Sequence, residues 1–579
     1  MKAALALFSA VVIGLFGLLT ADTLPGAPLA PPIAGTWSAG GHQLQVTGTL
    51  EGGFTVSAAS SWKVIGCPVN AGDVLFRYVP KGGSKYDLTW VVVWATTTQG
   101  QEGVKCEYTY EGPKTVTVTR SAAGALNLAC VGSACSATGA LTLKPVASKP
   151  PPPPTTTTPP GWTKLTLGYE VPRRYGLDEN KDGLIDYVTT RAQIDPKFWT
   201  ALITVRRPGG ATCDTSATYA WKIGSYSNTF ESLGNCVFAF RRFPKLGDYR
   251  VTVTATNGDQ KSIGEIWVKL QDFLIVGLGD SNGSGEGNPD IPGLAKPVWE
   301  DFRCHRSAQS YQARTASAIE KASDRSSVTF VHLACSGASI NQGLLAHYRG
   351  INDPGGVALP AQVAKLDELI GKRKPDAVIV SIGINDLGFG PMVAFCIEKT
   401  GCFASKGFDP AAPKKDLDEV IRGRIAALPG RYAAVAARLA KLGIPAKNVY
   451  LTEYPDSTRN SNGKICDPLL KVVGHGSFSG VEADWAHDAV LVPLNAAVAA
   501  AAKRHGWRLV AGAQQLFRRH GYCSSDSWIV PLTTSLLRQG LFWKGLGAAK
   551  AGTLHADAEG HQIQARLVVA AVKRTGLLK

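Results

Sequence analysis

Short runs of alternating apolar and polar residues fill the first half of the chain. Between residues 22 and 145 they include HQLQVTGTL, DLTWVVVWATT and KTVTVTR, which are separated by glycine-rich turns. A period of two is typical of strands with one buried face, so this stretch predicts an N-terminal all-β module. Residues 162–271 repeat the pattern in YAWKIGS and DYRVTVTATNG and predict a second all-β module.

The segment between the two modules has a different composition. Residues 146–161 include five consecutive prolines followed by four threonines. Such a segment cannot pack a core and forms an extended, stiff spacer, so we expect a linker there.

From residue 272 onward, short apolar runs alternate with longer helical ones. Strands are expected at residues 273–278, 329–334, 376–382, 447–452 and 507–511. Helices are expected between them, for example at residues 308–322, 417–442 and 484–505. This alternation predicts a parallel sheet with helices on both faces, so residues 272–579 should form a three-layer α/β domain. A chain of 579 residues is long enough for these several domains.

The N-terminus resembles an export signal. One basic residue, Lys2, precedes an apolar run from Ala3 to Ala21. This predicts a signal peptide over residues 1–21, with cleavage near Ala21 or Thr23, although the run is also long enough for an uncleaved anchor. Both alternatives export the rest of the chain, so we expect a secreted, periplasmic or extracellular protein. No second stretch is expected to cross a membrane.

The cysteines agree with an oxidising compartment. There are 12, all after the export segment, and none forms a C-x-x-C pair, which argues against zinc. Their order does not fix the connectivity, but we expect six disulfides. The expected pairs are Cys67–Cys106, Cys130–Cys135, Cys213–Cys236, Cys304–Cys335, Cys396–Cys402 and Cys466–Cys523.

The formal net charge of +16 favours contact with an anionic surface, such as lipid headgroups or acidic polysaccharide. The basic residues are dispersed rather than clustered, which is equally typical of a soluble surface. No motif indicates a nucleic-acid partner, and we expect a monomer.

One acidic loop lies inside the second module. In LDENKDGLIDY, oxygen-bearing side chains occupy positions 1, 3, 5 and 9 of an EF-hand-like spacing, with Gly183 at the sharp turn. The expected calcium ligands are Asp178, Asn180, Asp182 and Asp186. Thr189 stands where an EF-hand has Glu, so the loop is similar to shorter calcium loops of secreted bacterial proteins. A solvated acidic turn is the alternative.

The stretch IVGLGDSNGSGEG, residues 275–287, ends an apolar run in a cluster of glycines. A dinucleotide-binding loop is disfavoured, because no acidic residue ends the next strand and an exported enzyme meets little NAD. An α/β-hydrolase nucleophile elbow is disfavoured too, because that fold builds several strands before its nucleophile. A third serine-hydrolase plan, in which Gly-Asp-Ser opens the catalytic domain, remains.

Two further motifs meet the demands of that plan. LACSGASI places Gly337 after the second strand, and VIVSIGINDLGF places Asn385 after the third. Together with GDSNGSGEGNPD and a C-terminal histidine, these blocks resemble the SGNH (GDSL) hydrolase family over about residues 272–579. The Cys-His-Arg-Ser run at 304–307, with Cys335, is similar to a secreted bacterial lipase/esterase branch. The latter half of residues 162–271 resembles an immunoglobulin-like module of the PKD type.

The SGNH resemblance implies an acyl-transfer site. Ser281 would be the nucleophile, and the oxyanion donors would be the N–H groups of Ser281 and Gly337 and the side-chain amide of Asn385. His555 aligns with the family's base, whereas His561 aligns with the start of the last helix. Asp280 and Asp386 are expected to be structural.

The last block departs from the family pattern at two positions. Gly552 replaces the triad aspartate, and Ala556 replaces a proline. We therefore expect a Ser–His dyad steered by a backbone carbonyl near residues 552–553. Asp557 lies on the wrong side of His555 to orient it.

These features predict an exported serine esterase or lipase that needs no catalytic cofactor and carries a structural Ca²⁺ ion. Lipids, acylated polysaccharides and small esters are all compatible substrates. The alternative function is a glycan- or surface-binding adhesive protein on a hydrolase fold that has lost activity, which the missing aspartate favours.

Overall fold

The computed structural model describes residues 164–223, 236–352, 356–472, 476–541 and 549–576, and the backbone of strand Tyr226–Phe230 and of strands between residues 35 and 145. The expected signal peptide, the 146–161 linker and the side chains of the pairs Cys67–Cys106 and Cys130–Cys135 lie outside these described parts. Two compact units are distinguished by their internal contacts, residues 1–158 with 181–183 and the remainder of the chain.

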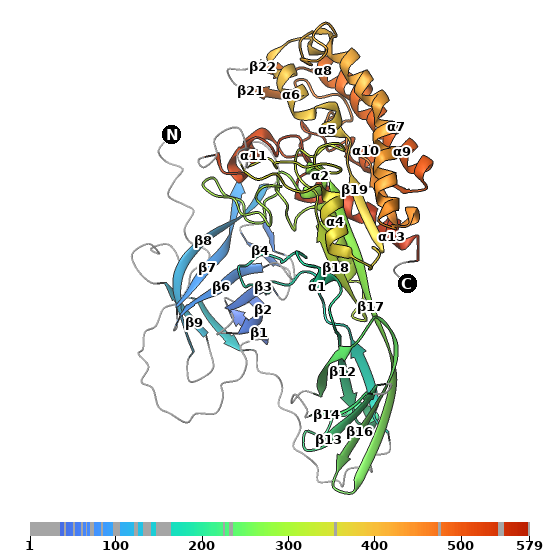
Figure 1. The fold of residues 1–579 in the computed structure, drawn as a ribbon. Helices are drawn as coiled ribbons and strands as arrows, with labels where there is room; N and C mark the ends of the chain where they lie inside the picture. Colours follow the sequence, from blue (N-terminus) through green and yellow to red (C-terminus); the bar gives the residue numbers. More distant parts are fainter. Residues whose placement is uncertain are drawn as a thin grey trace. The chain divides into compact units, whose positions relative to one another are not determined.

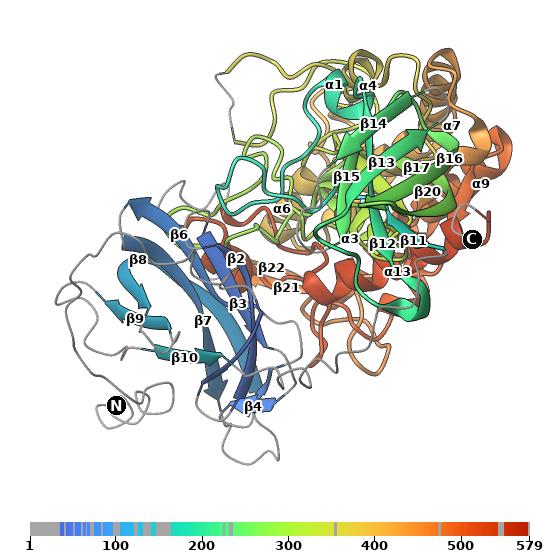
Figure 2. The same cartoon turned by 90° about the horizontal axis from the view of Figure 1, so that it is seen from below.

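The first unit contains a closed barrel of antiparallel strands, in the order β1-β10-β9-β8-β7-β6-β3-β2 (Figure 2). A separate hairpin joins β4 to β5. The strands are β1 Gly35–Ala39, β2 His42–Thr49, β3 Gly53–Ala58, β4 Trp62–Val64, β5 Cys67–Val69, β6 Val74–Gly82, β7 Lys85–Thr96, β8 Lys105–Arg120, β9 Leu126–Cys130 and β10 Leu141–Pro145.

The second unit begins with two small sheets around one core. One sheet has the order β11-β12-β15, and the other runs β14-β13-β16-β17. Alternate residues of these strands are buried, as the period of two in the sequence requires, and they share one apolar cluster. The strands are β11 Thr166–Glu170, β12 Trp199–Arg206, β13 Thr218–Ile223, β14 Tyr226–Phe230, β15 Val237–Phe243 and β16 Gly247–Asn257.

Strand β17, Gln260–Gly279, continues from these sheets into the α/β part without a break (Figure 1). It pairs antiparallel with β16 as far as Leu270 and parallel with β18 from Gln271. The boundary expected between residues 271 and 272 therefore falls inside one strand. Burial along β17 changes there from alternating to continuous, which explains why the sequence reads as a change of domain.

The α/β part is built on parallel strands in the order β18-β17-β19-β20-β23, a doubly wound arrangement. Leu274, Val276 and Leu278 of β17 face a core shared with α4, α7 and α9. Phe273 and Ile275 face the other core, shared with α3 and α13. The strands are β18 Ser326–His332, β19 Ala377–Ser381, β20 Val449–Thr452 and β23 Arg508–Val510, with a hairpin of β21 Leu470–Val472 and β22 Gly476–Phe478.

Helices cover both faces of this sheet, so the three-layer α/β prediction agrees with the structure. The described helices of the second unit are α1 Arg191–Ile194, α2 Ser281–Ser284, α3 Tyr311–Glu320, α4 Gln362–Ile370, α5 Ile384–Leu387, α6 Phe389–Glu398, α7 Leu417–Lys441, α8 Gly480–Trp485, α9 Val492–His505, α10 Ala513–Phe517, α11 Leu532–Arg538 and α13 Ala558–Lys573. A π-helical turn, Ala486–Leu491, joins α8 to α9.

Disulfide bonds join four of the expected pairs. They are Cys213–Cys236, Cys304–Cys335, Cys396–Cys402 and Cys466–Cys523, which confirms these four predictions.

One helical run in the described part of the chain, Gly480–His505, is long and apolar enough to cross a membrane by length and composition, with a mean hydropathy of 1.2. On these criteria the expectation of no second apolar stretch is wrong. However, 44% of that window is buried inside the protein, and α9 packs against α7, as is typical of a core helix.

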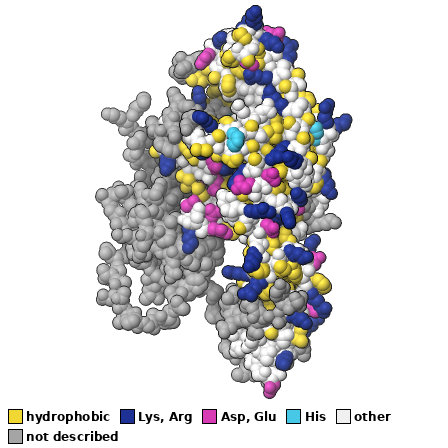
Figure 3. Space-filling view, viewed as in Figure 1, with side chains coloured by type: hydrophobic (Ala, Val, Ile, Leu, Met, Phe, Trp, Pro, Cys, Tyr) yellow, Lys and Arg dark blue, Asp and Glu magenta, His cyan; other side chains and the backbone are white. Residues whose placement is uncertain are grey.

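Lys and Arg side chains are scattered among Asp and Glu over the described part of the face in Figure 3.

Candidate active site

The candidate site lies where the central strands end. Ser281 lies two positions after the end of β17, Gly337 follows β18, and Asn385 follows β19. In open parallel sheets the carboxyl ends of strands meet at one edge, and ligands bind where the strand order reverses. Here that reversal lies around β17, so the fold brings these three chain segments to one edge of the sheet.

The turn that carries Ser281 requires glycine. Gly279 has a φ of 129°, and a Cβ atom there would lie 1.9 Å from the carbonyl oxygen of Ser381. Asp280 then caps α2 by accepting a hydrogen bond from the Asn282 N–H at 3.1 Å, and it also accepts one from the Tyr454 hydroxyl. Burial raises the pKa of Asp280 to about 7. Through these hydrogen bonds the Asp280 carboxylate stabilises the turn that carries Ser281.

His555 is in direct contact with Ser281. Its Nε2 atom lies 2.8 Å from the Ser281 Oγ atom, within the reach that a base needs. Its Nδ1 atom lies 3.3 Å from the carbonyl oxygen of Thr553. Burial lowers the pKa of His555, against the charge of Glu286 and the backbone carbonyls of residues 551–553. The ring is therefore poised to be neutral and to accept a proton.

The loop that holds His555 is clamped to a neighbouring segment. The N–H of Val530 donates to the carbonyl of His555 at 2.7 Å, and the N–H of Leu554 donates to the carbonyl of Val530 at 3.2 Å. Leu554 has a φ of 68°, a left-handed conformation that non-glycine residues rarely adopt. Such conformations cost about 1–3 kcal/mol and cluster at functional sites.

His561 lies in the first turns of the last helix, as expected, and Asp557 lies at the N-terminus of that helix. His561 is fully buried in α13, its Nδ1 atom accepts a hydrogen bond from the Tyr311 N–H at 3.2 Å, and burial lowers its pKa to about 3. Asp557 caps the same helix by accepting a bond from the Gly560 N–H at 2.8 Å. The contact with Ser281 therefore belongs to His555.

The loop of Gly337 is tied to the segment of Asn385. Gly337 has a φ of 80°, and a Cβ atom there would lie 2.2 Å from the Tyr348 hydroxyl oxygen. The Asn385 side-chain amide donates to the carbonyl of Ala338 at 3.0 Å. The neighbouring Asp386 accepts a bond from the Ile340 N–H at 2.9 Å, so it fixes the same loop.

An apolar pocket opens beside Ser281 and His555. Most of its walls are aliphatic or aromatic, and they come from α6, the β21–β22 hairpin and the π-helical turn. The lining side chains include Ile384, Phe389, Met392, Val393, Leu469, Phe478, Val490, Leu491 and Leu554. This pocket was not expected from the sequence, although the apolar run FGPMVAF at residues 389–395, shortly after Asn385, was a signal for it.

The expected calcium loop lies before α1. The Asp186 carboxylate accepts hydrogen bonds from the backbone N–H groups of Glu179 and, at 3.2 Å, of Asn180. Within the described ranges, no group of three or more His, Cys, Asp or Glu side chains is placed to hold a metal ion. Calcium binding by Asp178, Asn180, Asp182 and Asp186 therefore stays a prediction.

The fold and the serine–histidine contact define a hydrolase-like α/β domain. Residues 278–563, slightly less than half of the chain, match the GDSL-like Lipase/Acylhydrolase family. This match supports the coarse prediction of a GDSL-type ester hydrolase domain for that segment. No curated protein has a sequence that matches the chain.

Solved structures add little. A carbohydrate acetylesterase from Xanthomonas citri is 10% identical with a TM-score of 0.16; the match covers 45% of this chain and 57% of that one. The extracellular domain of a hybrid two-component system from B. thetaiotaomicron is 13% identical with a TM-score of 0.13, over 40% of this chain and 31% of that one. The chain thus spans only part of either structure, and at these TM-scores neither likeness bears on function.

Proposed function

We propose that the α/β part is a serine hydrolase of carboxylic esters in which Ser281 becomes acylated and His555 is the base. The observation that carries this proposal is the 2.8 Å contact between His555 Nε2 and Ser281 Oγ. A base within hydrogen-bond reach of a hydroxyl nucleophile is the arrangement that acyl transfer requires.

In the first step, His555 Nε2 takes the hydroxyl proton as Ser281 Oγ attacks the ester carbonyl carbon. The carbonyl oxygen becomes an anion, for which the N–H groups of Ser281 and Gly337 and the amide of Asn385 are the proposed donors. The proton on His555 then passes to the departing alcohol. Water repeats the sequence on the acyl-enzyme and releases the acid.

The Thr553 carbonyl takes the part of the absent triad acid. It lies 3.3 Å from His555 Nδ1 and can accept a hydrogen bond from an Nδ1–H group, which leaves Nε2 free to act as base. A carbonyl stabilises an imidazolium less than a carboxylate does. Protonated His555 therefore depends more on other nearby groups for its stabilisation.

The apolar pocket favours esters with longer alkyl acyl chains over acetyl esters. An acyl chain bound to Ser281 would lie against side chains such as Phe389, Met392 and Leu491. Each buried methylene contributes about 0.8 kcal/mol, or roughly fourfold in kcat/KM. The four disulfides support the proposal that the enzyme is exported. In this proposal the Ig- or PKD-like module and the N-terminal barrel position the enzyme near its substrate.

A series of p-nitrophenyl esters tests this function. We expect kcat/KM to rise from acetate through butyrate to octanoate, and Ser281→Ala to hydrolyse none of them measurably while keeping its unfolding transition. A preference for acetate would contradict the apolar acyl pocket. No hydrolysis by the folded wild-type protein would favour the alternative, a glycan- or surface-binding protein.

A further inference from the structure

A fully buried acid lies directly behind the proposed nucleophile. Glu286 has no exposed surface, and its backbone N–H donates to the Ser281 carbonyl at 3.1 Å. Both of its carboxylate oxygens lie within 2.9 Å of the His305 Nδ1 atom. Gln539 Nε2 donates to the same carboxylate at 2.6 Å. A buried carboxylate this well supplied with donors is built to stay ionised.

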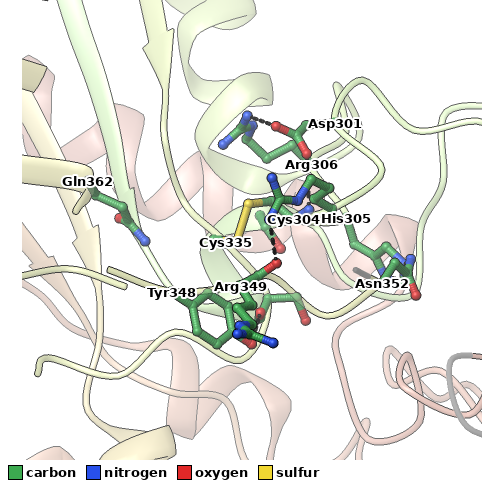
Figure 4. The surroundings of a disulfide bond; sticks show 12 residues. Asp301, Cys304, His305, Arg306, Cys335, Tyr348, Arg349, Asn352 and Gln362 are labelled. Carbon is green, nitrogen blue, oxygen red and sulfur yellow. Dashed lines mark hydrogen bonds and ion pairs between the residues drawn. A yellow bond between two sulfur atoms is a disulfide. The ribbon is translucent and has the colours of Figure 1, made fainter. Parts of the chain in front are cut away.

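His305 is held between Glu286 and a second polar neighbour. Asn352, labelled beside His305 in Figure 4, donates through Nδ2 to the Phe302 carbonyl at 3.1 Å, and the same nitrogen faces His305 Nε2. The Nδ1 atom of the ring contacts the Glu286 carboxylate. The ring is fixed further by stacking on Trp299.

Gln539 connects this acid to the loop of the proposed base. A Cβ atom on Gly552 would lie 2.0 Å from Gln539 Oε1 and 2.5 Å from the Gly287 Cα atom. Gly552 accepts a hydrogen bond from the His555 N–H at 3.1 Å. The Glu286–Gln539 pair therefore fills the space beside Gly552, where the resembled family carries its triad aspartate.

Glu286 also acts on His555 through its charge. Burial lowers the pKa of His555, and Glu286 is the largest influence that raises it again. His561 also interacts electrostatically with His555, and its own pKa of about 3 keeps it neutral. On its far side Glu286 faces Tyr348, and burial together with Glu286 raises the pKa of that phenol to about 12. Among the described residues, Glu286 is thus the anion that faces the proposed base.

We infer that Glu286 is a positioning residue that supplies the negative charge of the missing triad acid: through Gln539 it supports the His555 loop, and its charge stabilises the protonated imidazole. This inference rests on the proposed function of Ser281 and His555. The carboxylate acts from behind the loop, rather than by a direct hydrogen bond to Nδ1, which the Thr553 carbonyl already contacts.

The test is the pH profile of kcat/KM for the full chain, together with an NMR titration of the His555 ring. Glu286→Gln removes the charge and keeps the shape. The His555 pKa should fall by on the order of one pH unit, the acidic limb of kcat/KM should move down by the same amount, and kcat should fall about tenfold or more. Glu320→Gln is the matched control, because Glu320 is also buried but lies in α3. It should shift neither curve.

The double variant Glu286→Gln with Gln539→Glu keeps the complementary hydrogen bond and returns the negative charge to the cluster. This variant should return the His555 pKa most of the way to its wild-type value and recover most of kcat. A purely structural role of Glu286 predicts neither recovery. It also serves if the single variant folds poorly, as judged by circular dichroism. An unchanged His555 pKa in a folded Glu286→Gln enzyme would overturn the inference and leave the proposed function intact. Wild-type protein without Ser281-dependent hydrolysis would instead overturn the proposed function.

Discussion

Placing an aspartate at position 552, where the resembled family has one, should weaken this enzyme rather than complete a triad. The new Cβ atom would lie 2.0 Å from Gln539 Oε1, 2.5 Å from the Gly287 Cα atom and 3.0 Å from the Ser535 hydroxyl oxygen. The Gln539 side chain can turn away, but Gly287 presents backbone and cannot. The new carboxylate would also enter a buried site beside the Glu286 carboxylate, which repels it.

The expected size follows from these contacts. Overpacking against fixed backbone costs about 1–3 kcal/mol. Movement of the 551–555 loop by about 1 Å would displace His555 from Ser281, which costs up to roughly a hundredfold in rate. We therefore expect Gly552→Asp to lose about 1–3 kcal/mol of stability and tenfold to a hundredfold in kcat.

Urea unfolding of the full chain and p-nitrophenyl butyrate kinetics measure both effects. Gly423→Asp is the matched control, because a Cβ atom at that exposed position of α7 meets nothing within 4 Å. It should change stability by less than about 1 kcal/mol and leave kcat unaltered. A Gly552→Asp enzyme that is as stable as wild type and faster would refute the reasoning about this loop.

Three further predictions test the site and the calcium loop. His555→Ala should lose nearly as much kcat as Ser281→Ala, and the double variant little more, because the two act as a unit; His561→Ala should mainly lower Tm, and the reverse pattern would contradict the assignment. Because burial lowers the pKa of His555, the base stays neutral to lower pH, and the acidic limb of kcat/KM should lie below the ordinary value of 6.5; a limb above it would contradict this sign. Chelation should lower Tm without changing the esterase rate if residues 178–186 bind calcium; calorimetry with neither binding nor a shift would rule the ion out.

The sequence predicted the α/β part well because its signals are local. Each expected strand overlaps an observed one, since runs such as Phe273–Val276 are apolar throughout and are buried on both faces of the sheet. The resemblance aligned His555 with the base and His561 with the start of the last helix, and α13 indeed begins at Ala558. Four disulfides joined cysteines as expected.

Other features depend on contacts between distant residues and could not be read from the sequence. Glu286 and Gln539 are 253 positions apart, and no local pattern links them. The continuity of β17 was hidden because its burial changes from one face to both within a single strand. The apolar pocket was missed because its walls come from α6, a hairpin and a π-helical turn that meet only in the folded chain.

The central claim is that Ser281, activated by His555, becomes covalently acylated. The most direct measurement is labelling of the folded full chain with a fluorophosphonate ester, followed by peptide mass spectrometry and hydrolysis assays on the same sample. We expect one phosphonyl group on the peptide that contains Ser281, loss of ester hydrolysis in proportion to labelling, and no labelling of Ser281→Ala. Labelling at another residue, or full hydrolysis by a folded Ser281→Ala protein, would contradict it.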